Sequence, residues 1–239
     1  DLIKVISGPR RAGKSFFAVH MLAKAGSYGY VNFDDERLVG LENYDEIISA
    51  LHTVYSNPRY ILLDEVQNLL RWELFVNRLQ RQGARLLITG SNANLLSSEL
   101  ATHLTGRYSA AVLFPFSFTE YVSFAGGELT RTEKMDFLNR YAEQGGYPEP
   151  LIKGVDRTDY LRTLMHATLY KDIIKRFKIR SVQGIEDLAR YLMSNIGREY
   201  SLNALSNVTK CRSVHTIEKY IRYLREAFLL FQSRVFHSK

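Results

Sequence analysis

The sequence predicts an α/β protein built on a parallel sheet, followed by a smaller helical part. Five short, β-rich apolar runs alternate with helical patterns through the first half of the chain. After residues 114–116 these strand signals stop, and the pattern is helical until the last few residues. The 239 residues are enough for one large domain and a small satellite.

The five predicted strands are each nearly continuously apolar, as expected of strands that are buried on both faces. They span residues 2–7, 30–33, 60–63, 85–89 and 108–113. Helical patterns lie between them, and the clearest has apolar residues at spacings of three and four, which predict one stripe packed on the sheet. The residues of this stripe are Trp72, Phe75, Val76 and Leu79.

The next segment predicts a helical lid. Thr130 and Glu133 form a capping-box pattern that opens a helix ending at Gln144, before two glycines and a proline. A long helix is expected over residues 156–177. The predicted domains are therefore a core of residues 1–118, a lid and connector of residues 119–170, and a C-terminal domain of residues 171–239.

The C-terminal domain shows three helical patterns separated by short turns, which is typical of a helix-turn-helix. The second helix is expected from the cap Ser201 to Val208, and residues 229–236 predict a strand that begins a wing. This order favours a winged-helix domain whose wing is truncated. The buried positions expected of the first and third helices are Ile185, Leu188, Leu192, Ile196, Ile217, Tyr220, Ile221, Leu224 and Phe228.

Composition argues against a membrane protein and against a disulfide-stabilised one. The chain is 46% hydrophobic and 24% charged, with no apolar run near the roughly 20 residues that a membrane span needs. The single cysteine, Cys211, cannot form an internal disulfide. We therefore expect a cytoplasmic protein with no membrane partner.

The net charge of +7 is spread unevenly. Residues 171–239 hold 14 Lys and Arg against 6 Asp and Glu, whereas the rest of the chain holds 18 against 19. On the third C-terminal helix His215, Lys219 and Arg222 share one face, and Arg212 precedes it. This face predicts contact with double-stranded DNA. A protein or domain contact, or simple solvation of the charges, are the alternatives.

Residues 8–15 match the phosphate-binding pattern G-x-x-x-x-G-K-S, between a predicted strand and a predicted helix. The glycines allow backbone N–H groups to surround a phosphate, Lys14 is placed to reach the β- and γ-phosphates, and Ser15 offers a hydroxyl to Mg²⁺. The residues expected to bind nucleotide are Gly8, Pro9, Arg10, Arg11, Ala12, Gly13, Lys14, Ser15 and Phe16.

Two carboxylates end the predicted strand at residues 60–63. Asp64 is expected to hold Mg²⁺ together with Ser15. Glu65 is expected to polarise the water that attacks the γ-phosphate. The alternative for Glu65 is a structural role as the cap of the following helix.

Two further candidates for catalysis follow. Ser91 and Asn92 lie just after the fourth predicted strand, where they would orient the attacking water if that strand is central; alternatively they form a turn and a helix cap. Arg107 precedes the fifth strand and is a candidate arginine finger, acting on the nucleotide of its own or a neighbouring chain. Its alternative is a surface salt bridge.

The ordered motifs GPRRAGKS, YVNFDDERL, YILLDEVQN, LLITGSNANLLSSELATHLTGR, FPFSFTEY and GGYPEP resemble an AAA-related prokaryotic family of P-loop ATPases. The resemblance implies a P-loop NTPase sheet with strand order 5-1-4-3-2, a helical lid, a winged-helix domain and, in full-length members, a further C-terminal domain. It also implies ATP or ADP with Mg²⁺ as the ligand, and places Arg107 where related ATPases carry an arginine finger.

These observations predict an ATP-hydrolysing, nucleotide-driven switch that acts at DNA. One alternative is a STAND-like signalling switch that binds a protein partner, with a homo-oligomer also open. The other is a small-molecule kinase, which Glu65 and the absence of an obvious acceptor-binding segment disfavour.

Overall fold

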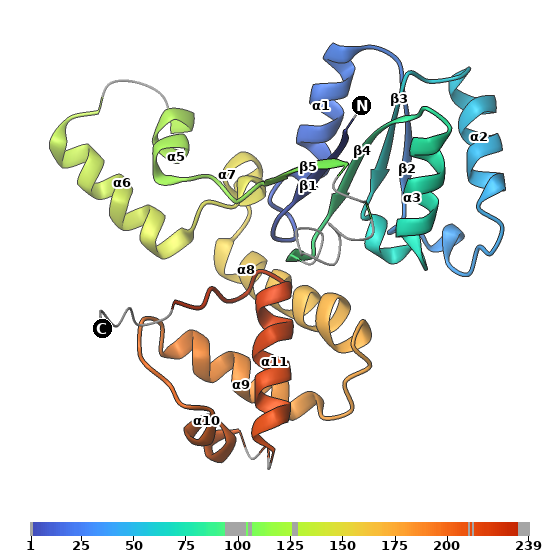
Figure 1. Ribbon diagram of the computed structural model, residues 1–239. Helices are drawn as coiled ribbons and strands as arrows, with labels where there is room; N and C mark the ends of the chain where they lie inside the picture. Colours follow the sequence, from blue (N-terminus) through green and yellow to red (C-terminus); the bar gives the residue numbers. More distant parts are fainter. Residues whose placement is uncertain are drawn as a thin grey trace, which may run out of the picture. The chain divides into compact units, whose positions relative to one another are not determined.

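The computed structural model describes residues 2–93, 104, 107–125, 129–209, 211 and 213–233 (Figure 1). The chain divides into two compact units, Asp1–Arg157 and Thr158–Lys239. The first contains the sheet, and the described residues of the second contain helices and connecting turns with no strand. The three-domain division expected from the sequence stays a prediction.

The first unit is built on a parallel sheet of five strands in the order β2-β3-β4-β1-β5. Read from the other edge, this is the order 5-1-4-3-2, so the predicted α/β fold is confirmed. Each predicted strand is found within two residues of its expected start. The strands are β1 Ile3–Ser7, β2 Tyr28–Asn32, β3 Tyr60–Asp64, β4 Arg85–Gly90 and β5 Tyr108–Val112.

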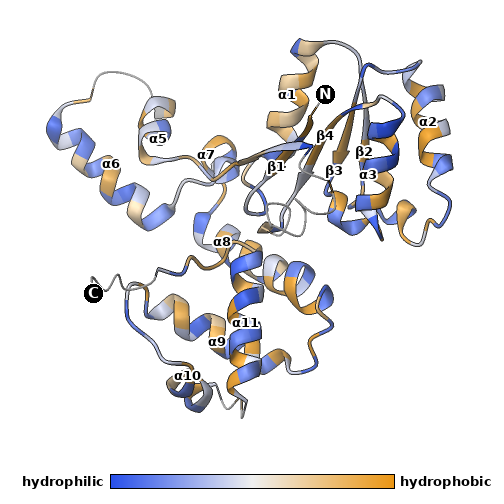
Figure 2. Ribbon diagram, in the orientation of Figure 1, coloured by the Kyte–Doolittle hydropathy of each residue, from blue (hydrophilic) through white to orange (hydrophobic). Residues whose placement is uncertain are grey.

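Helices cover both faces of the sheet, with α1 (Lys14–Ala25) on one side and α2 (Asp45–Tyr55) and α3 (Trp72–Arg81) on the other (Figure 1). Alternate side chains of the strands feed the two layers: Ile6 packs with α1, and Val5 belongs to the larger cluster with α2 and α3. The inner strands β1, β3 and β4 are accordingly rich in hydrophobic residues, and α2 and α3 are amphipathic (Figure 2). The predicted stripe on α3 is buried in full.

Strand β5 departs from the sequence-based prediction. Residues 109–112 are exposed, although the apolar run predicted burial on both faces. The reason is its position, because β5 pairs only with β1 and forms the edge of the sheet. Small residues at an edge strand look the same in sequence as small residues inside a sheet.

The helices that follow the sheet are α5 (Phe118–Ala125), α6 (Arg131–Gln144) and α7 (Pro148–Lys153). The capping box at Thr130 is present, which confirms the predicted start of α6. Phe116, just before α5, is hydrogen-bonded to the end of α6 and to the residues that follow it. Its N–H donates to the carbonyl of Gly146 at 2.8 Å, and its own carbonyl accepts the Tyr141 hydroxyl at 2.8 Å. Gly146 has no room for a side chain, since a Cβ would lie 2.1 Å from Phe116 O.

The second unit begins with one continuous helix, in which α8 (Arg157–Ala167) runs on into the π-helical segment η4 (Thr168–Lys175). The long helix predicted over residues 156–177 is thus confirmed. Three helices follow, α9 (Val182–Ser194), α10 (Leu202–Val208) and α11 (Val214–Glu226). Leu188, Leu205 and Leu224 are among the side chains that form their shared core.

Three predictions in this unit are wrong. Ile196 was expected in the buried stripe of the first helix, but α9 ends at Ser194 and Ile196 is 85% exposed. Phe228 was expected on the third helix, but it follows the end of α11 with a positive φ of 58°. Residues 229–233 form no strand, since the described part of this unit offers no strand to pair with them; residues 234–236 lie outside the described ranges.

Membrane insertion finds no support among the described helices, because none combines the length and the apolar character that a bilayer crossing requires.

Candidate functional site

The phosphate loop, residues 8–13, connects β1 to α1 and depends on two glycines. Gly8 has φ 150°, and a Cβ there would lie 2.0 Å from the carbonyl oxygen of Leu113. Gly13 caps α1 with φ 96°, and glycine has no side chain to accept the N–H groups of the first helical turn. Those N–H groups are therefore available to an anion at the positive end of the helix dipole.

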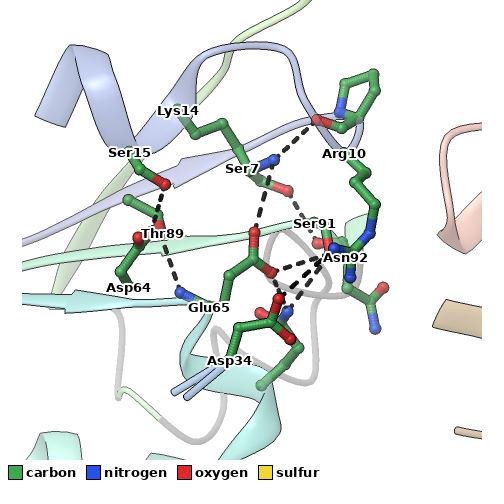
Figure 3. Close-up of polar contacts among 12 residues, drawn as sticks. Ser7, Arg10, Lys14, Ser15, Asp34, Asp64, Glu65, Thr89, Ser91 and Asn92 are labelled. Carbon is green, nitrogen blue, oxygen red and sulfur yellow. Dashed lines mark hydrogen bonds and ion pairs between the residues drawn. The ribbon is translucent and has the colours of Figure 1, made fainter. Parts of the chain in front are cut away.

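Lys14 brings a buried cation to this loop. It is only 4% exposed, and its Nζ donates to the carbonyl of Pro9 at 2.8 Å. The same Nζ lies 4.0 Å from Oε1 of Glu65, and the two side chains point toward one another (Figure 3). Burying an ammonium group costs free energy unless hydrogen-bond acceptors or an opposite charge stabilise it. The Pro9 carbonyl and the Glu65 carboxylate fill these two roles for Lys14.

Three hydroxyl groups surround the carboxylate of Asp64 at the end of β3. Ser15 Oγ donates to Oδ1 at 2.8 Å, Thr89 Oγ1 donates to the same oxygen, and Tyr30 OH donates to Oδ2 at 2.9 Å. Burial, followed by the negative charge of Asp64, raises the pKa of the Tyr30 phenol well above its usual value. The carboxylate is held in place, and together with Ser15 it supplies the oxygen ligands that Mg²⁺ prefers.

Glu65 adopts a left-handed backbone conformation with φ 52°, which is uncommon outside glycine. Its Oε2 accepts hydrogen bonds from Ser91 Oγ at 3.0 Å and from Gln67 Nε2. Its side chain makes no capping hydrogen bond to η2 (Val66–Asn68), the helical turn that follows. Glu65 occupies the N-cap position of η2 through its backbone, while its carboxylate contacts Ser91 and Gln67 instead of capping the turn.

Strand β4 lies between β1 and β3. This central position was the condition under which Ser91 and Asn92 were expected to reach the attacking water. The position of β4 brings Ser91 to Glu65 and Asn92 to the end of β1, where Ser7 Oγ donates to the Asn92 carbonyl at 2.8 Å. Both residues are buried, which distinguishes them from an ordinary surface turn. Ser91 thus orients a carboxylate in this structure.

The arginines of the loop are held by carboxylates outside it. Arg10 lies 3.7 Å from Asp34, and Arg11 NH1 lies 2.7 Å from Glu149 at the start of α7. Lys153, and then Arg11, hold the pKa of the Glu149 carboxyl below its usual value. Phe16 is 79% exposed, so its side chain adds nothing to the enclosed part of the site.

Arg107 lies at the other end of the sheet. Its carbonyl accepts the N–H of Ile3 at 2.9 Å, beside the first residue of β1, whereas the phosphate loop follows the last. Five residues of strand separate the two ends by roughly 15 Å, which exceeds the reach of an arginine side chain. The alternative in which Arg107 acts on the nucleotide of its own chain is therefore wrong, and action on a neighbouring chain stays a prediction.

The residues predicted to meet DNA are exposed on α11. His215 Nδ1 lies 3.6 Å from Glu218, and Arg222 Nε lies 3.6 Å from Glu226. Lys219 is exposed between them. Arg212, the fourth residue of this prediction, lies outside the described residues.

Four contributors to the site were not identified from the sequence. All of them lie within motifs that carried the family resemblance, but no motif revealed which group each one contacts. They are Tyr30, Asp34, Gln67 and Glu149. Thr89 was expected in the polar cluster at the end of the fourth strand, but its contact with Asp64 was not.

Replacement of Tyr30 by phenylalanine tests the hydroxyl cage around Asp64. We expect a loss of about 1–2 kcal/mol in the free energy of unfolding, because a buried carboxylate loses one donor. Urea denaturation measures the change. Tyr55→Phe is the matched control, since the Tyr55 hydroxyl makes only a long 3.4 Å contact with a backbone carbonyl. Equal losses in both variants would contradict the role assigned to Tyr30.

Comparison with known proteins agrees with this geometry. The model of a family described as an AAA domain matches residues 1–122, just over half of the chain, and a domain of unknown function (DUF8612) matches residues 135–239. A solved Walker-type ATPase of Pyrococcus abyssi has the same fold, with a TM-score of 0.53 at 13% identity over 92% of this chain and 84% of that one.

Two curated relatives are similar along nearly the whole chain. An uncharacterized protein of Methanocaldococcus jannaschii is 32% identical over 96% of the chain, and one of Haemophilus influenzae is 30% identical over 98%. The chain spans 56% and 62% of the length of these relatives. With the phosphate loop and the strand order described above, the matches establish that the chain belongs to an AAA-related family of P-loop ATPases.

Proposed function

We propose that the protein binds and hydrolyses Mg-ATP and uses the cycle as a switch that acts at DNA. The observation that carries the proposal is the convergence of one cation and two carboxylates at the phosphate loop. Lys14, Asp64 and Glu65 come from α1 and from the end of β3, and each is held by contacts of its own.

Nucleotide binding rests on the loop and on Lys14. The first-turn N–H groups of α1 and the ammonium group of Lys14 neutralise the phosphates. Ser15 Oγ and an Asp64 oxygen, 2.8 Å apart, would hold Mg²⁺ either directly or through water. When bound, Mg²⁺ supplies further charge neutralisation of the β- and γ-phosphates.

Hydrolysis rests on Glu65. Its carboxylate accepts a proton from the attacking water at Oε1 or Oε2, while Ser91 and Gln67 hold it in position. A kinase would in addition need a segment that binds its acceptor, and none is obvious in the sequence, so the carboxylate 4.0 Å from Lys14 is assigned to water rather than to a small-molecule acceptor.

Coupling to movement is supported by the ion pair between Arg11 and Glu149. One partner lies in the phosphate loop and the other in α7. Phosphate binding changes the charge around Arg11, so the contact with α7 depends on the nucleotide state. This gives the helical segment after the sheet a means to respond to ATP.

Phosphate release measured against protein concentration tests the proposal, with and without duplex DNA. We expect Mg²⁺-dependent release that DNA stimulates, with a rate per chain that rises with concentration, because Arg107 serves a neighbouring chain. Arg107→Ala should remove the concentration dependence, and Arg59→Ala, at another exposed arginine, should not.

The alternative switch, which binds a protein partner, predicts slow release that DNA does not change. If the rate per chain does not change with protein concentration, for the parent and for Arg107→Ala alike, Arg107 does not act on the nucleotide of a neighbouring chain. Absence of any Mg²⁺-dependent release would contradict the hydrolytic function itself.

A further inference from the structure

Four exposed cations lie within residues 171–180 of the second unit, on η4 and in the connection that follows it. They are Lys171, Lys175, Lys178 and Arg180, named here the basic stripe. We propose that the basic stripe, rather than the face of α11, binds the phosphate backbone of double-stranded DNA. The inference rests on the proposed action at DNA and identifies the surface that performs it.

The local fold explains why these side chains project into solvent. Leu169 and Ile173 bury the opposite side of η4 in the core of the unit. Lys171 and Lys175 are four residues apart and therefore lie on one side of the helix, about one turn from each other. Lys178 and Arg180 follow in the short connection between η4 and α9.

The stripe is not neutralised by the carboxylates around it. Among the residues that the structure describes, no carboxylate forms an ion pair with any of the four cations. Asp172, the one acid within the segment, is 3% exposed and faces the core. Two acids of α9 hydrogen-bond to neutral partners and keep their negative charges: Glu186 accepts the Tyr170 hydroxyl at 2.6 Å, and Asp187 accepts from Gln183 at 2.8 Å. Together they offset part of the charge of the stripe, whose four cations still outnumber them.

The face of α11 has a different charge balance. Two of its three described basic groups lie beside glutamates, at 3.6 Å in each case. Glu218 is exposed and would approach the phosphates together with the cations and repel them, and Glu226 offsets the charge of Arg222 from a largely buried position. The basic stripe therefore offers the larger uncompensated positive charge, which is what binding to a DNA backbone requires.

A backbone contact of this kind has a measurable signature. Each phosphate neutralised by a cation adds about 0.9 to the slope of log affinity against log salt. Lysine and arginine side chains that contact phosphates do not distinguish one base from another. We therefore expect binding that depends steeply on salt and weakly on sequence.

Two matched triple variants test the proposal. One combines Lys171→Gln, Lys175→Gln and Arg180→Gln, and the other combines His215→Gln, Lys219→Gln and Arg222→Gln. Fluorescence anisotropy of a labelled duplex of about 30 base pairs, titrated at several salt concentrations, gives affinity and salt slope for each. Thermal unfolding and Mg-ATP hydrolysis without DNA check that both variants remain folded, since exposed substitutions have small effects on stability.

The stripe variant should bind roughly 10- to 100-fold more weakly at low salt, with a salt slope reduced by about 2–3, while the α11 variant stays close to the parent. A loss confined to the α11 variant would overturn the inference and leave the DNA function intact. Equal affinity in both variants and the parent would overturn it as well. Failure of the parent chain to bind the duplex at low salt would overturn the inference together with the proposed action at DNA.

Discussion

Replacing Glu65 with glutamine should slow phosphate release by roughly 10²- to 10⁴-fold and leave Mg-ATP binding nearly unchanged. The amide has the shape of the carboxylate and keeps an oxygen to accept from Ser91, but it cannot take a proton from water. Single-turnover phosphate release and calorimetric titration with a non-hydrolysable ATP analogue separate the two effects.

Glu46→Gln is the matched control for this experiment, because Glu46 is an exposed glutamate on α2. It should hydrolyse ATP at the parent rate. If Glu65→Gln also releases phosphate at the parent rate, Glu65 is not the general base. If it loses binding instead, the carboxylate serves mainly to hold Lys14.

Replacing Lys14 with methionine should weaken the binding of Mg-ATP by about 10- to 150-fold, because a buried hydrogen bond to a charged group contributes roughly 1.5–3 kcal/mol. Methionine keeps most of the side-chain length and removes only the ammonium group. Calorimetric titration measures the loss directly. Hydrolysis at saturating nucleotide should fall as well, since the same group faces the charge that develops on the γ-phosphate.

Lys4→Met is the matched control, since Lys4 is an exposed lysine near the start of β1, the strand that precedes the phosphate loop. It should bind Mg-ATP as the parent does. Equal affinity of Lys14→Met and the parent would show that the phosphates bind elsewhere.

The sheet could be predicted closely from sequence because its strands are short, apolar and separated by helical patterns. Val5 and Leu62 lie in short apolar runs that are typical of strands buried on both faces. Strand order came from the family resemblance and not from the strands themselves. The exposure of β5 could not be predicted, because an apolar run does not indicate whether a strand is central or at an edge.

The second unit shows the limits of periodicity near helix ends. Ile196 continues the apolar spacing of α9, but the helix ends at Ser194. Beyond that residue the helical spacing no longer indicates which side chains are buried, and Ile196 is exposed. Residues 229–233 have the composition of a strand, yet a strand requires a partner, and sequence composition does not supply one.

The candidate site could be predicted where its residues are close in sequence or fixed by a motif. Lys14, Ser15 and Asp64 are of this kind, and the structure brings them together. The contacts of Tyr30 with Asp64, and of Glu149 with Arg11, join residues far apart in the chain. Such contacts follow from the folded topology, so a single sequence does not reveal them.

Calorimetric titration of the parent chain with a non-hydrolysable ATP analogue, in Mg²⁺ and in excess EDTA, tests the central claim most directly. A pocket made of the loop N–H groups, Lys14, Ser15 and Asp64 predicts one site per chain, with clearly tighter binding in Mg²⁺. The absence of saturable binding in Mg²⁺, or equal affinity with and without the ion, would contradict it.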